Sequence, residues 1–230
     1  MKLALVTVLA ALLLPTTAQA AEPVVLVHGT FGDSTNWGYI ERQLDARTFA
    51  IDYGNRGTGD IATSARQLAA FVDDVLARTG ASKVDIVGHS QGGMMPRYYV
   101  KNLGGAGKVD DLIGLSPSNH GTDLSVAEND LCVACNQQAA GSAFLTDLNA
   151  GDETPGDVDY TVVQTRYDEV VTPFTSAFLD GATNVLLQDK CAADASEHLT
   201  IMVDQNAVQW IKNALGRTGP ADPSFTPVCV

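Results

Sequence analysis

Short runs of β-forming apolar residues alternate along the chain with segments in which apolar residues recur every three or four positions. The runs show little polar alternation, which is typical of strands buried on both faces of a parallel sheet. Strands are predicted over 24–28, 49–53, 84–87, 111–115, 160–165 and 183–188, and helices over 36–45, 61–78, 92–103, 139–148 and 204–215. This alternation indicates an α/β fold with a central, mostly parallel sheet and right-handed crossovers.

The amino-terminal segment has a pattern of its own. Lys2 precedes an apolar run over 3–14, and small residues follow at 18–21. This is the pattern of a secretory signal peptide, and the run is shorter than the roughly 20 residues that span a membrane. We therefore expect a signal peptide over 1–20, cleavage after Ala20, a single domain over 21–230, no transmembrane segment, and secretion into the extracellular space.

Acidic residues outnumber basic ones, with 27 Asp and Glu against 14 Lys and Arg and a formal net charge of −13. Such a surface repels nucleic acid, so nucleic acid is excluded as a partner. Many of the acids fall between 109 and 165, where there is no Lys or Arg. A calcium site there is one interpretation, but the spacing fits no EF-hand loop, and a solvated acidic surface without a metal ion is favoured.

Four cysteines, Cys132, Cys135, Cys191 and Cys229, indicate two disulfides in an exported protein. Three pairings exist, and we favour Cys132 with Cys135 and Cys191 with Cys229. The second pair would fasten the segment that contains His198. A redox-active C-x-x-C or a four-cysteine zinc site is the competing interpretation, which an oxidising compartment disfavours.

The sequence G-H-S-Q-G-G at 88–93 contains G-x-S-x-G between a predicted strand and a predicted helix. In that setting the pattern is typical of a nucleophile elbow, a sharp turn that projects a serine hydroxyl from the end of the sheet. A serine hydroxyl becomes a good nucleophile only when a base takes its proton. Ser90 is therefore the candidate nucleophile.

The partners of this serine are expected later in the chain, because this architecture carries its residues in the order serine, acid, histidine. His198 lies between the last strand and the last helix, and we expect it to act as the general base. Asp168, in the turn after the fifth strand, is the expected acid that orients the imidazole. Glu169 is its nearest rival, and Asp189 and Asp194 remain alternatives.

An oxyanion that forms on an attacked carbonyl needs backbone N–H donors. One is expected from Gln91, directly after the nucleophile, and another from the loop after the first strand, where we favour Thr30 over Phe31. Apolar residues that adjoin these positions are expected to line an acyl pocket, although each also fits core packing. They are Phe31, Met94, Val170, Val171 and Leu199.

The interval 117–159 carries no strong strand pattern. Long irregular inserts in compact domains are usually lids or binding loops, so we expect a lid-like insert near the mouth of the site.

The segment G-T-G-D-I-A at 57–62 fits the dinucleotide-binding pattern G-x-G-x-x-A. It follows the second predicted strand rather than the first, and no acidic residue ends the next strand. Dinucleotide binding is therefore the weaker hypothesis.

Four segments carry a family resemblance: V-V-L-V-H-G-T-F-G at 24–32, G-H-S-Q-G-G-M-M-P-R-Y-Y at 88–99, L-S-P-S-N-H-G-T at 115–122 and D-E-V-V-T-P at 168–173. The first three are similar to secreted bacterial triacylglycerol lipases of the lipase class 2 group, in the α/β-hydrolase superfamily, and the last resembles the acid turn of the yeast lipase B type. The resemblance implies an α/β-hydrolase fold, the triad Ser90, Asp168 and His198, and oxyanion donors at Thr30 and Gln91.

The resemblance also implies hydrolysis of lipid carboxylic esters without a cofactor, and no calcium pattern of the family carries over to this chain. The expected partner is a lipid or ester substrate met at a lipid–water interface, and the protein is expected to be a monomer. A second hypothesis keeps the triad and makes the substrate cutin, a polyester or a small soluble ester. A binding protein without catalysis is disfavoured, because all three residue types of the triad occur in order.

Overall fold

The computed structural model describes residues 22–124 and 131–230, so the signal peptide predicted over 1–20 lies outside the described residues. A six-stranded sheet runs through the molecule in the order β2-β1-β3-β4-β5-β6, and every neighbouring pair is parallel. Its strands are β1 (Val24–Val27), β2 (Thr48–Ile51), β3 (Val84–His89), β4 (Val109–Leu115), β5 (Asp159–Gln164) and β6 (Thr183–Leu186). The predicted parallel sheet of six strands is confirmed.

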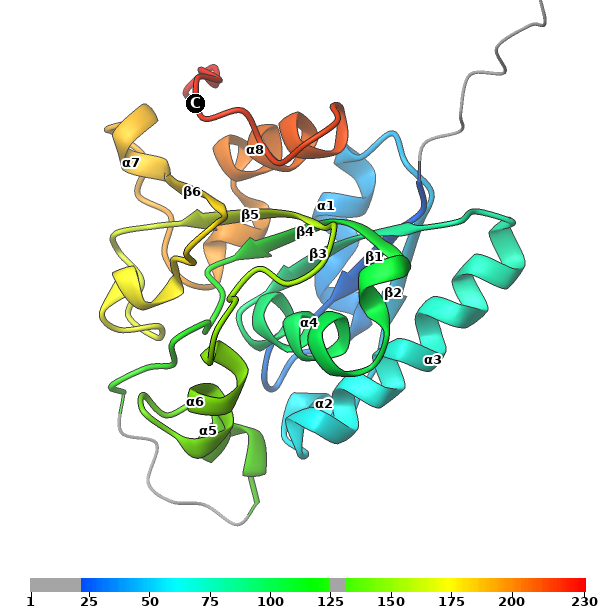
Figure 1. The fold of residues 1–230 in the computed structure, drawn as a ribbon. Coiled ribbons are helices and arrows are strands. Elements are labelled where there is room, and N and C mark those ends of the chain that lie inside the picture. The colour runs from blue at the N-terminus through cyan, green and yellow to red at the C-terminus, as the bar shows by residue number, and fades with distance from the viewer. Residues whose placement is uncertain (1–21, 125–130) are drawn as a thin grey trace, which may run out of the picture.

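Helices cover both faces of this sheet (Figure 1). On one face lie α3 (Ile61–Thr79) and α4 (Gln91–Asn102), and on the other α1 (Gly38–Gln43) and α8 (Gln205–Leu215). The short elements are η1 (Ser34–Trp37), α2 (Gly54–Gly57), η2 (Gly105–Gly107), α5 (Val133–Gln137), α6 (Ala143–Asn149), η3 (Phe174–Ala177), α7 (Leu187–Lys190) and η4 (Thr200–Val203), where η denotes a 3-10 helix. Among these described helices, none is long and apolar enough to cross a membrane.

The core consists of two apolar layers, one on each face of the sheet. Successive residues of a strand point to opposite faces, so Val25 and Val27 belong to the layer beneath α3 and α4. Val24 and Leu26 belong to the layer beneath α1 and α8. All four are fully buried, which explains why the strands appear in the sequence as continuous apolar runs.

The ends of α3 lie where the sequence predicts them. The Asp60 side chain accepts a hydrogen bond from the backbone N–H of Thr63, and Gly80 ends the helix at a φ of 74°.

Two other predicted boundaries are wrong. The helix predicted over 36–45 is a 3-10 turn followed by the short α1, and the strand predicted over 183–188 ends at Leu186, where α7 begins. Short apolar runs fit a strand or a helical turn equally well, so periodicity does not place such a boundary.

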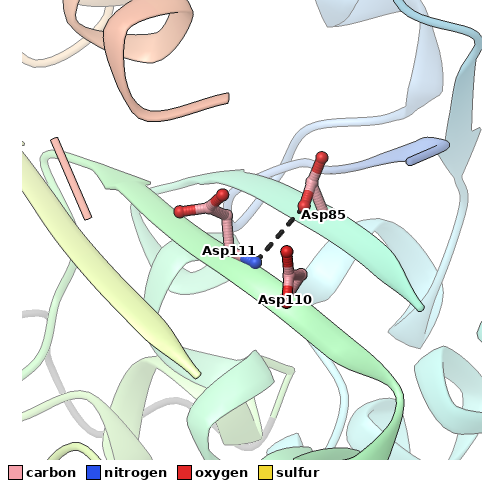
Figure 2. A group of neighbouring side chains, drawn as sticks. All are labelled: Asp85, Asp110 and Asp111. Carbon is pink, nitrogen blue, oxygen red and sulfur yellow. Dashed lines mark hydrogen bonds between the residues drawn. The ribbon is translucent and has the colours of Figure 1, made fainter. Parts of the chain in front are cut away.

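The pairing of β3 with β4 is irregular at its amino end, where the register shifts between Val84 and Ile86. As a result, one residue of β3, Asp85, lies opposite two residues of β4, Asp110 and Asp111. This β-bulge gathers three acidic side chains at the amino edge of the sheet (Figure 2).

The described part of the segment between β4 and β5 contains α5 and α6 but no strand. The helix predicted over 139–148 corresponds to α6, which begins only after Ser142 caps it, and α5 is an addition to the predicted elements. The N–H of Ala134 donates to the carbonyl of Thr58, and the Gln137 side chain accepts from the N–H of Ile61. These contacts attach the insert to the start of α3.

The four cysteines form two disulfides, Cys132–Cys135 and Cys191–Cys229, and the described residues contain no free cysteine. This is the favoured pairing. The second bridge spans a sequence separation of 38, and closing such a loop contributes about 4 kcal/mol in the chain-entropy model. It joins the carboxyl-terminal tail to the segment that precedes His198.

Candidate active site

Ser90 occupies a strained turn between β3 and α4. Its φ of 54° and ψ of −124° lie in a region that side-chain-bearing residues rarely adopt, and such strain costs about 1–3 kcal/mol. The turn is tight because backbone atoms approach closely. A Cβ on Gly88 would lie 1.8 Å from the carbonyl oxygen of Gly92, and a Cβ on Gly92 would lie 2.0 Å from that of Val27. The two glycines are therefore required by the elbow that presents Ser90.

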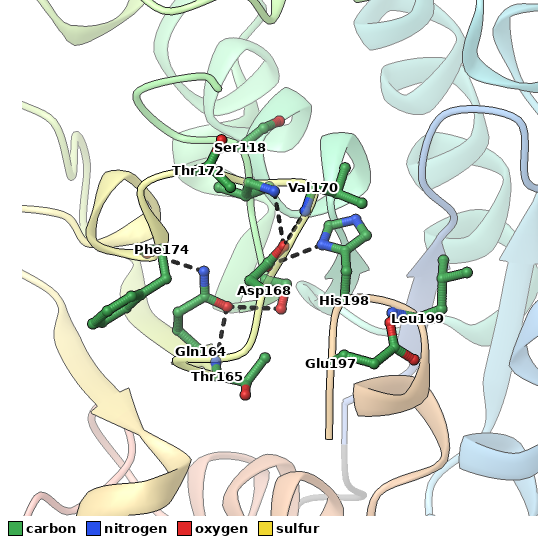
Figure 3. A network of polar contacts seen from close by, with 12 residues as sticks. Ser118, Gln164, Thr165, Asp168, Val170, Thr172, Phe174, Glu197, His198 and Leu199 are labelled. Carbon is green, nitrogen blue, oxygen red and sulfur yellow. Dashed lines mark hydrogen bonds and ion pairs between the residues drawn. The ribbon is translucent and has the colours of Figure 1, made fainter. Parts of the chain in front are cut away.

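His198 and Asp168 form a buried, hydrogen-bonded pair (Figure 3). The Nδ1 atom of His198 lies 2.9 Å from Oδ2 of Asp168. The other carboxylate oxygen accepts from the backbone N–H groups of Val171 at 2.8 Å and Val170 at 3.0 Å. Because the carboxylate accepts from Nδ1–H, the Nε2 atom of the imidazole keeps its lone pair and can accept a proton.

The electrostatics of this pair favour a charged carboxylate. Burial alone would raise the pKa of Asp168, but the hydrogen bond and charge of His198, together with the N–H groups of Val171 and Val170, hold this pKa below its usual value. Asp168 is therefore ionised at neutral pH and can stabilise a protonated His198.

Ser90 and His198 line the same cavity, which has a volume of about 290 Å³. Within the described residues, no hydrogen bond yet joins the Ser90 hydroxyl to His198, and such bonds commonly tighten only when substrate binds. The rival residues contact other groups. Glu169 is exposed, Asp189 pairs with Arg166, and Asp194 accepts from Ser196. Of the four candidate acids, the structure therefore places Asp168 in contact with His198.

The backbone N–H groups of Thr30 and Gln91 have no acceptor among the described residues. Gln91 is the first residue of α4, where helix N–H groups have no intrahelical partner. The N–H of Phe31, the alternative donor, is already committed to the carbonyl of Arg56 at 2.7 Å. The Arg56 guanidinium in turn donates to the carbonyl of Phe31 at 2.6 Å. Of the two candidates in this loop, Thr30 is therefore the one free to donate.

Gln138, which sequence reasoning missed, connects the insert to this oxyanion loop. Its side-chain Nε2 donates to the Thr30 hydroxyl at 2.9 Å and to the Gln91 side chain at 3.2 Å. The Thr30 hydroxyl donates onward to the Gln91 side chain at 2.6 Å, and the Gln138 side-chain oxygen accepts from Ser118 at 2.8 Å. No local sequence pattern marks Gln138, because its partners lie far away in the chain.

The glycine pattern at 57–62 has a packing role. Gly57 has a φ of 71°, and a Cβ there would lie 3.1 Å from the carbonyl oxygen of Gly29 and 3.2 Å from the Cα of Thr30. Gly57 thus allows the chain after β2 to pack against the oxyanion loop. This contact accounts for the glycine without a dinucleotide.

Of the five predicted pocket residues, Phe31, Val170, Val171 and Leu199 line the cavity. Phe31 and Leu199 lie at its mouth, with 60% and 65% of their surfaces exposed. The prediction for Met94 is wrong. Met94 is fully buried in the core layer beneath α3 and α4, because its position on α4 turns its side chain toward the sheet. The remaining lining residues include Ser118, Thr122, Leu124, Cys135 and Gln138, all from the insert.

His89, the variable position of the serine motif, contacts the segment that carries the general base. Its Nε2 lies 2.8 Å from the backbone carbonyl oxygen of His198, and the two ring centroids are 4.8 Å apart. A carbonyl oxygen only accepts, so Nε2 of His89 carries the proton. Burial and the neighbouring His198 lower the pKa of His89 to about 3, so its ring is neutral at physiological pH.

Two kinds of sequence comparison bear on the family. A family model described as lipase (class 2) matches residues 21–211. The chain is 37% identical over 105 residues to a triacylglycerol lipase of Burkholderia plantarii, covering 39% of this chain and 28% of that protein. It is 35% identical over 155 residues to a triacylglycerol lipase of Vibrio cholerae serotype O1, covering 58% of this chain and 46% of that protein. The chain thus spans less than half the length of these two relatives.

Solved structures bear on the fold. Aspergillus fumigatus lipase B matches with a TM-score of 0.80 and 25% identity, covering 90% of this chain and 57% of that chain. The mature form of Bacillus licheniformis lipase BlEst2 matches with a TM-score of 0.66 and 19% identity, covering 80% of this chain and 87% of that chain, a likeness of fold alone. Since the family model covers most of the sequence, the chain belongs to the lipase class 2 family and has the α/β-hydrolase fold that its sequence predicts.

Proposed function

We propose that this protein hydrolyses carboxylic ester bonds of lipids through a Ser90-His198-Asp168 triad. The observation that carries the proposal is the hydrogen-bonded His198–Asp168 pair, whose imidazole opens into the same cavity as the strained Ser90 turn. Membership of the lipase class 2 family supports the same chemistry.

In the acylation step, the Ser90 hydroxyl attacks the ester carbonyl carbon while His198 Nε2 takes the hydroxyl proton. The C=O π-electron pair moves to oxygen, and the N–H groups of Thr30 and Gln91 donate hydrogen bonds to the resulting oxyanion. When the tetrahedral intermediate collapses, the bond to the alcohol oxygen breaks and His198 returns the proton to that oxygen. The products of this half-reaction are the free alcohol and a Ser90 acyl ester.

Water then repeats the sequence in the deacylation step. His198 removes a proton from water, the hydroxide oxygen attacks the acyl carbon, and the Ser90 oxygen leaves with the proton held by His198. The fatty acid is released and the three groups return to their starting states. Asp168, kept ionised by its N–H donors, stabilises the imidazolium in both steps.

The lining of the cavity supports a substrate with an apolar acyl chain. Val170, Val171 and Leu124 present side chains into it, and the exposed rings and branches of Phe31 and Leu199 border its mouth. Burial of apolar surface contributes roughly 25 cal/mol per Å², so each methylene that enters strengthens binding. We infer that the protein acts on lipid esters at a lipid–water interface after export, which the two disulfides support.

The test of the proposal is active-site labelling with an alkyl phosphonate ester. We expect one adduct, on Ser90, in the wild-type protein and none in the His198→Ala variant, because the hydroxyl attacks phosphorus only when its proton is removed. Mass spectrometry of peptides locates the adduct. Applied to protein collected from culture medium, the same method identifies the mature amino terminus, which we expect at Ala21. An adduct on another residue would contradict the triad.

The same preparation addresses the alternative substrate class. We expect faster turnover of tributyrin and of a long-chain triacylglycerol emulsion than of a polyester film. Turnover confined to the film would instead favour a cutinase-like or polyester-degrading esterase.

His89 is predicted to act as a positioning residue for this reaction. Its N–H fixes the backbone of His198, so His89→Leu is expected to lower kcat on a soluble p-nitrophenyl ester about 10-fold, equivalent to about 1.4 kcal/mol, with little change in KM. His89→Gln, which retains an N–H donor of similar reach, is expected to recover most of the rate. Circular dichroism should first show that His89→Leu is folded like the wild type. Equal kcat values for the two folded proteins would then rule out this role.

A further inference from the structure

A second group of ionisable side chains lies at the amino edge of the sheet, at the opposite end of β3 from Ser90. Asp85 is the second residue of β3, and Asp110 and Asp111 are the second and third residues of β4. One carboxylate oxygen from each lies within 4.8 Å of the others. The β-bulge between the strands brings the two consecutive aspartates of β4 beside Asp85 (Figure 2).

Two of these three carboxylates are buried with few protein partners. Asp111 is only 4% exposed, and its Oδ1 atom is buried without any hydrogen-bond partner. Asp85 is 6% exposed, and one of its oxygens accepts a long, 3.3 Å hydrogen bond from the backbone N–H of Asp111. Buried carboxylates are normally paired or bound to a metal, because an unpaired buried charge is very costly. The orphaned oxygen of Asp111 therefore points to a ligand that compensates it.

The charges around the group leave an excess of negative charge. Lys83 pairs with Asp110 at 2.8 Å, at the exposed side of the group. Neither buried carboxylate has an ion pair among the described residues. A cation between the three carboxylates would compensate this excess of negative charge.

We propose that Asp85, Asp110 and Asp111 form a calcium-binding site that stabilises the fold. Three carboxylates supply the oxygen ligands that hard divalent cations prefer. Calcium takes about six to eight oxygen ligands in a flexible geometry, whereas Mg²⁺ demands a near-ideal octahedron and usually keeps several of its waters. The three carboxylates lie within 4.8 Å of one another, close enough to share one calcium ion. The expectation of a solvated acidic surface does not hold for Asp111, because the bulge buries it together with Asp85.

Bound calcium would join the amino ends of β3 and β4, the central strands of the sheet. The site does not line the catalytic cavity, so we expect its effect on stability rather than on turnover. The proposal thus goes beyond ester hydrolysis and does not depend on it.

The test is thermal unfolding of the full, disulfide-bonded protein after removal of divalent ions with EDTA and desalting. Calcium sites of extracellular proteins typically have Kd values of about 10⁻⁴–10⁻³ M. At 10 mM CaCl₂, binding at that affinity is expected to raise the Tm by about 3–10 °C. MgCl₂ at 10 mM, and NaCl at the same ionic strength, are expected to raise it by less than about 1 °C.

Asp111→Asn keeps the shape of the side chain and removes its charge, and we expect it to abolish the calcium-dependent shift. Asp85→Asn is expected to abolish the shift as well, and it replaces Asp111→Asn in the test if that variant folds poorly. Asp147→Asn makes the same charge change at an exposed position of α6, and it should leave the shift intact. The absence of a calcium-dependent shift in the wild type, an equal shift with MgCl₂, or a full shift in both cluster variants would overturn the proposal.

Discussion

Replacing Ser90 with alanine is expected to lower kcat for ester hydrolysis by about 10⁵–10⁶-fold. The variant lacks the oxygen to which the acyl group is transferred, so the reaction that remains is attack by water. The N–H groups of Thr30 and Gln91 stay in place, and they would leave a residual acceleration of roughly 10³-fold over the uncatalysed rate. KM should change little, because the apolar cavity that holds the acyl chain is untouched.

The stability of this variant separates chemistry from folding. The Ser90 side chain donates no hydrogen bond to a described residue, so Ser90→Ala should unfold within about 1 °C of the wild type. Ser90→Gly should be equally inactive but more stable, by about 2–6 °C in Tm, because glycine adopts the observed φ of 54° without a steric penalty. The measurements are kcat by pH-stat titration on tributyrin and Tm by calorimetry. A Ser90→Ala protein with more than about 1% of wild-type kcat would exclude Ser90 as the nucleophile.

Replacing Asp168 with asparagine is expected to lower kcat by about 10⁴-fold. The amide nitrogen of asparagine can donate to His198 Nδ1, which would place the imidazole proton on Nε2, facing Ser90. An imidazole in that tautomer cannot accept the serine proton, and the imidazolium also loses its counter-charge. Pre-steady-state assays on a p-nitrophenyl ester should show that acylation itself slows. Glu169→Gln is the matched control, since it removes an exposed carboxylate one residue away, and its kcat should remain within about twofold of the wild type.

The difference in stability between the wild type and Asp168→Asn should depend on pH in a defined direction. In the folded protein the pKa of Asp168 is below its ordinary value of 3.8, so the unfolded chain binds the proton more readily than the folded one. The charged carboxylate therefore stabilises the wild type at pH values above about 4, and this contribution is lost as the pH falls through the folded pKa. We expect the difference in unfolding free energy between the two proteins to be largest near neutral pH and to shrink as the pH falls below about 4. A difference that grows on acidification would contradict the observed hydrogen bonding.

Much of the fold could be predicted from the sequence because its determinants are local. Continuous apolar runs mark strands covered on both faces, and the Asp60 cap and Gly80 set the ends of α3. The elbow is equally local, since glycines on both sides of Ser90 are needed for the backbone to turn so sharply. Where a short apolar run fits two states, as at Leu186 and Leu187, the pattern placed the boundary wrongly.

The candidate site could be predicted from the sequence only in part. The elbow pattern identified Ser90, and the order of serine, acid and histidine favoured His198 and Asp168 but left other acids open. The structure brings His198 and Asp168 into contact. Order along the chain could not exclude Phe31 as an oxyanion donor, because that depended on the hydrogen bond from its N–H to Arg56. Met94 was misplaced for a related reason, since adjacency to Ser90 in sequence does not fix the direction of its side chain on the helix.

By itself, the sequence determined the class of sheet, the elbow around Ser90 and the family, because each is encoded within a few residues or in their order. It left three pairings of the four cysteines possible. Only the tertiary structure decided that Gln138 reaches the oxyanion loop, that His89 holds the backbone of His198, and that a β-bulge buries Asp85 and Asp111 together. These contacts join segments 26 to 109 positions apart. They depend on strand register and side-chain direction, which the packing of the whole chain fixes and a local pattern does not record.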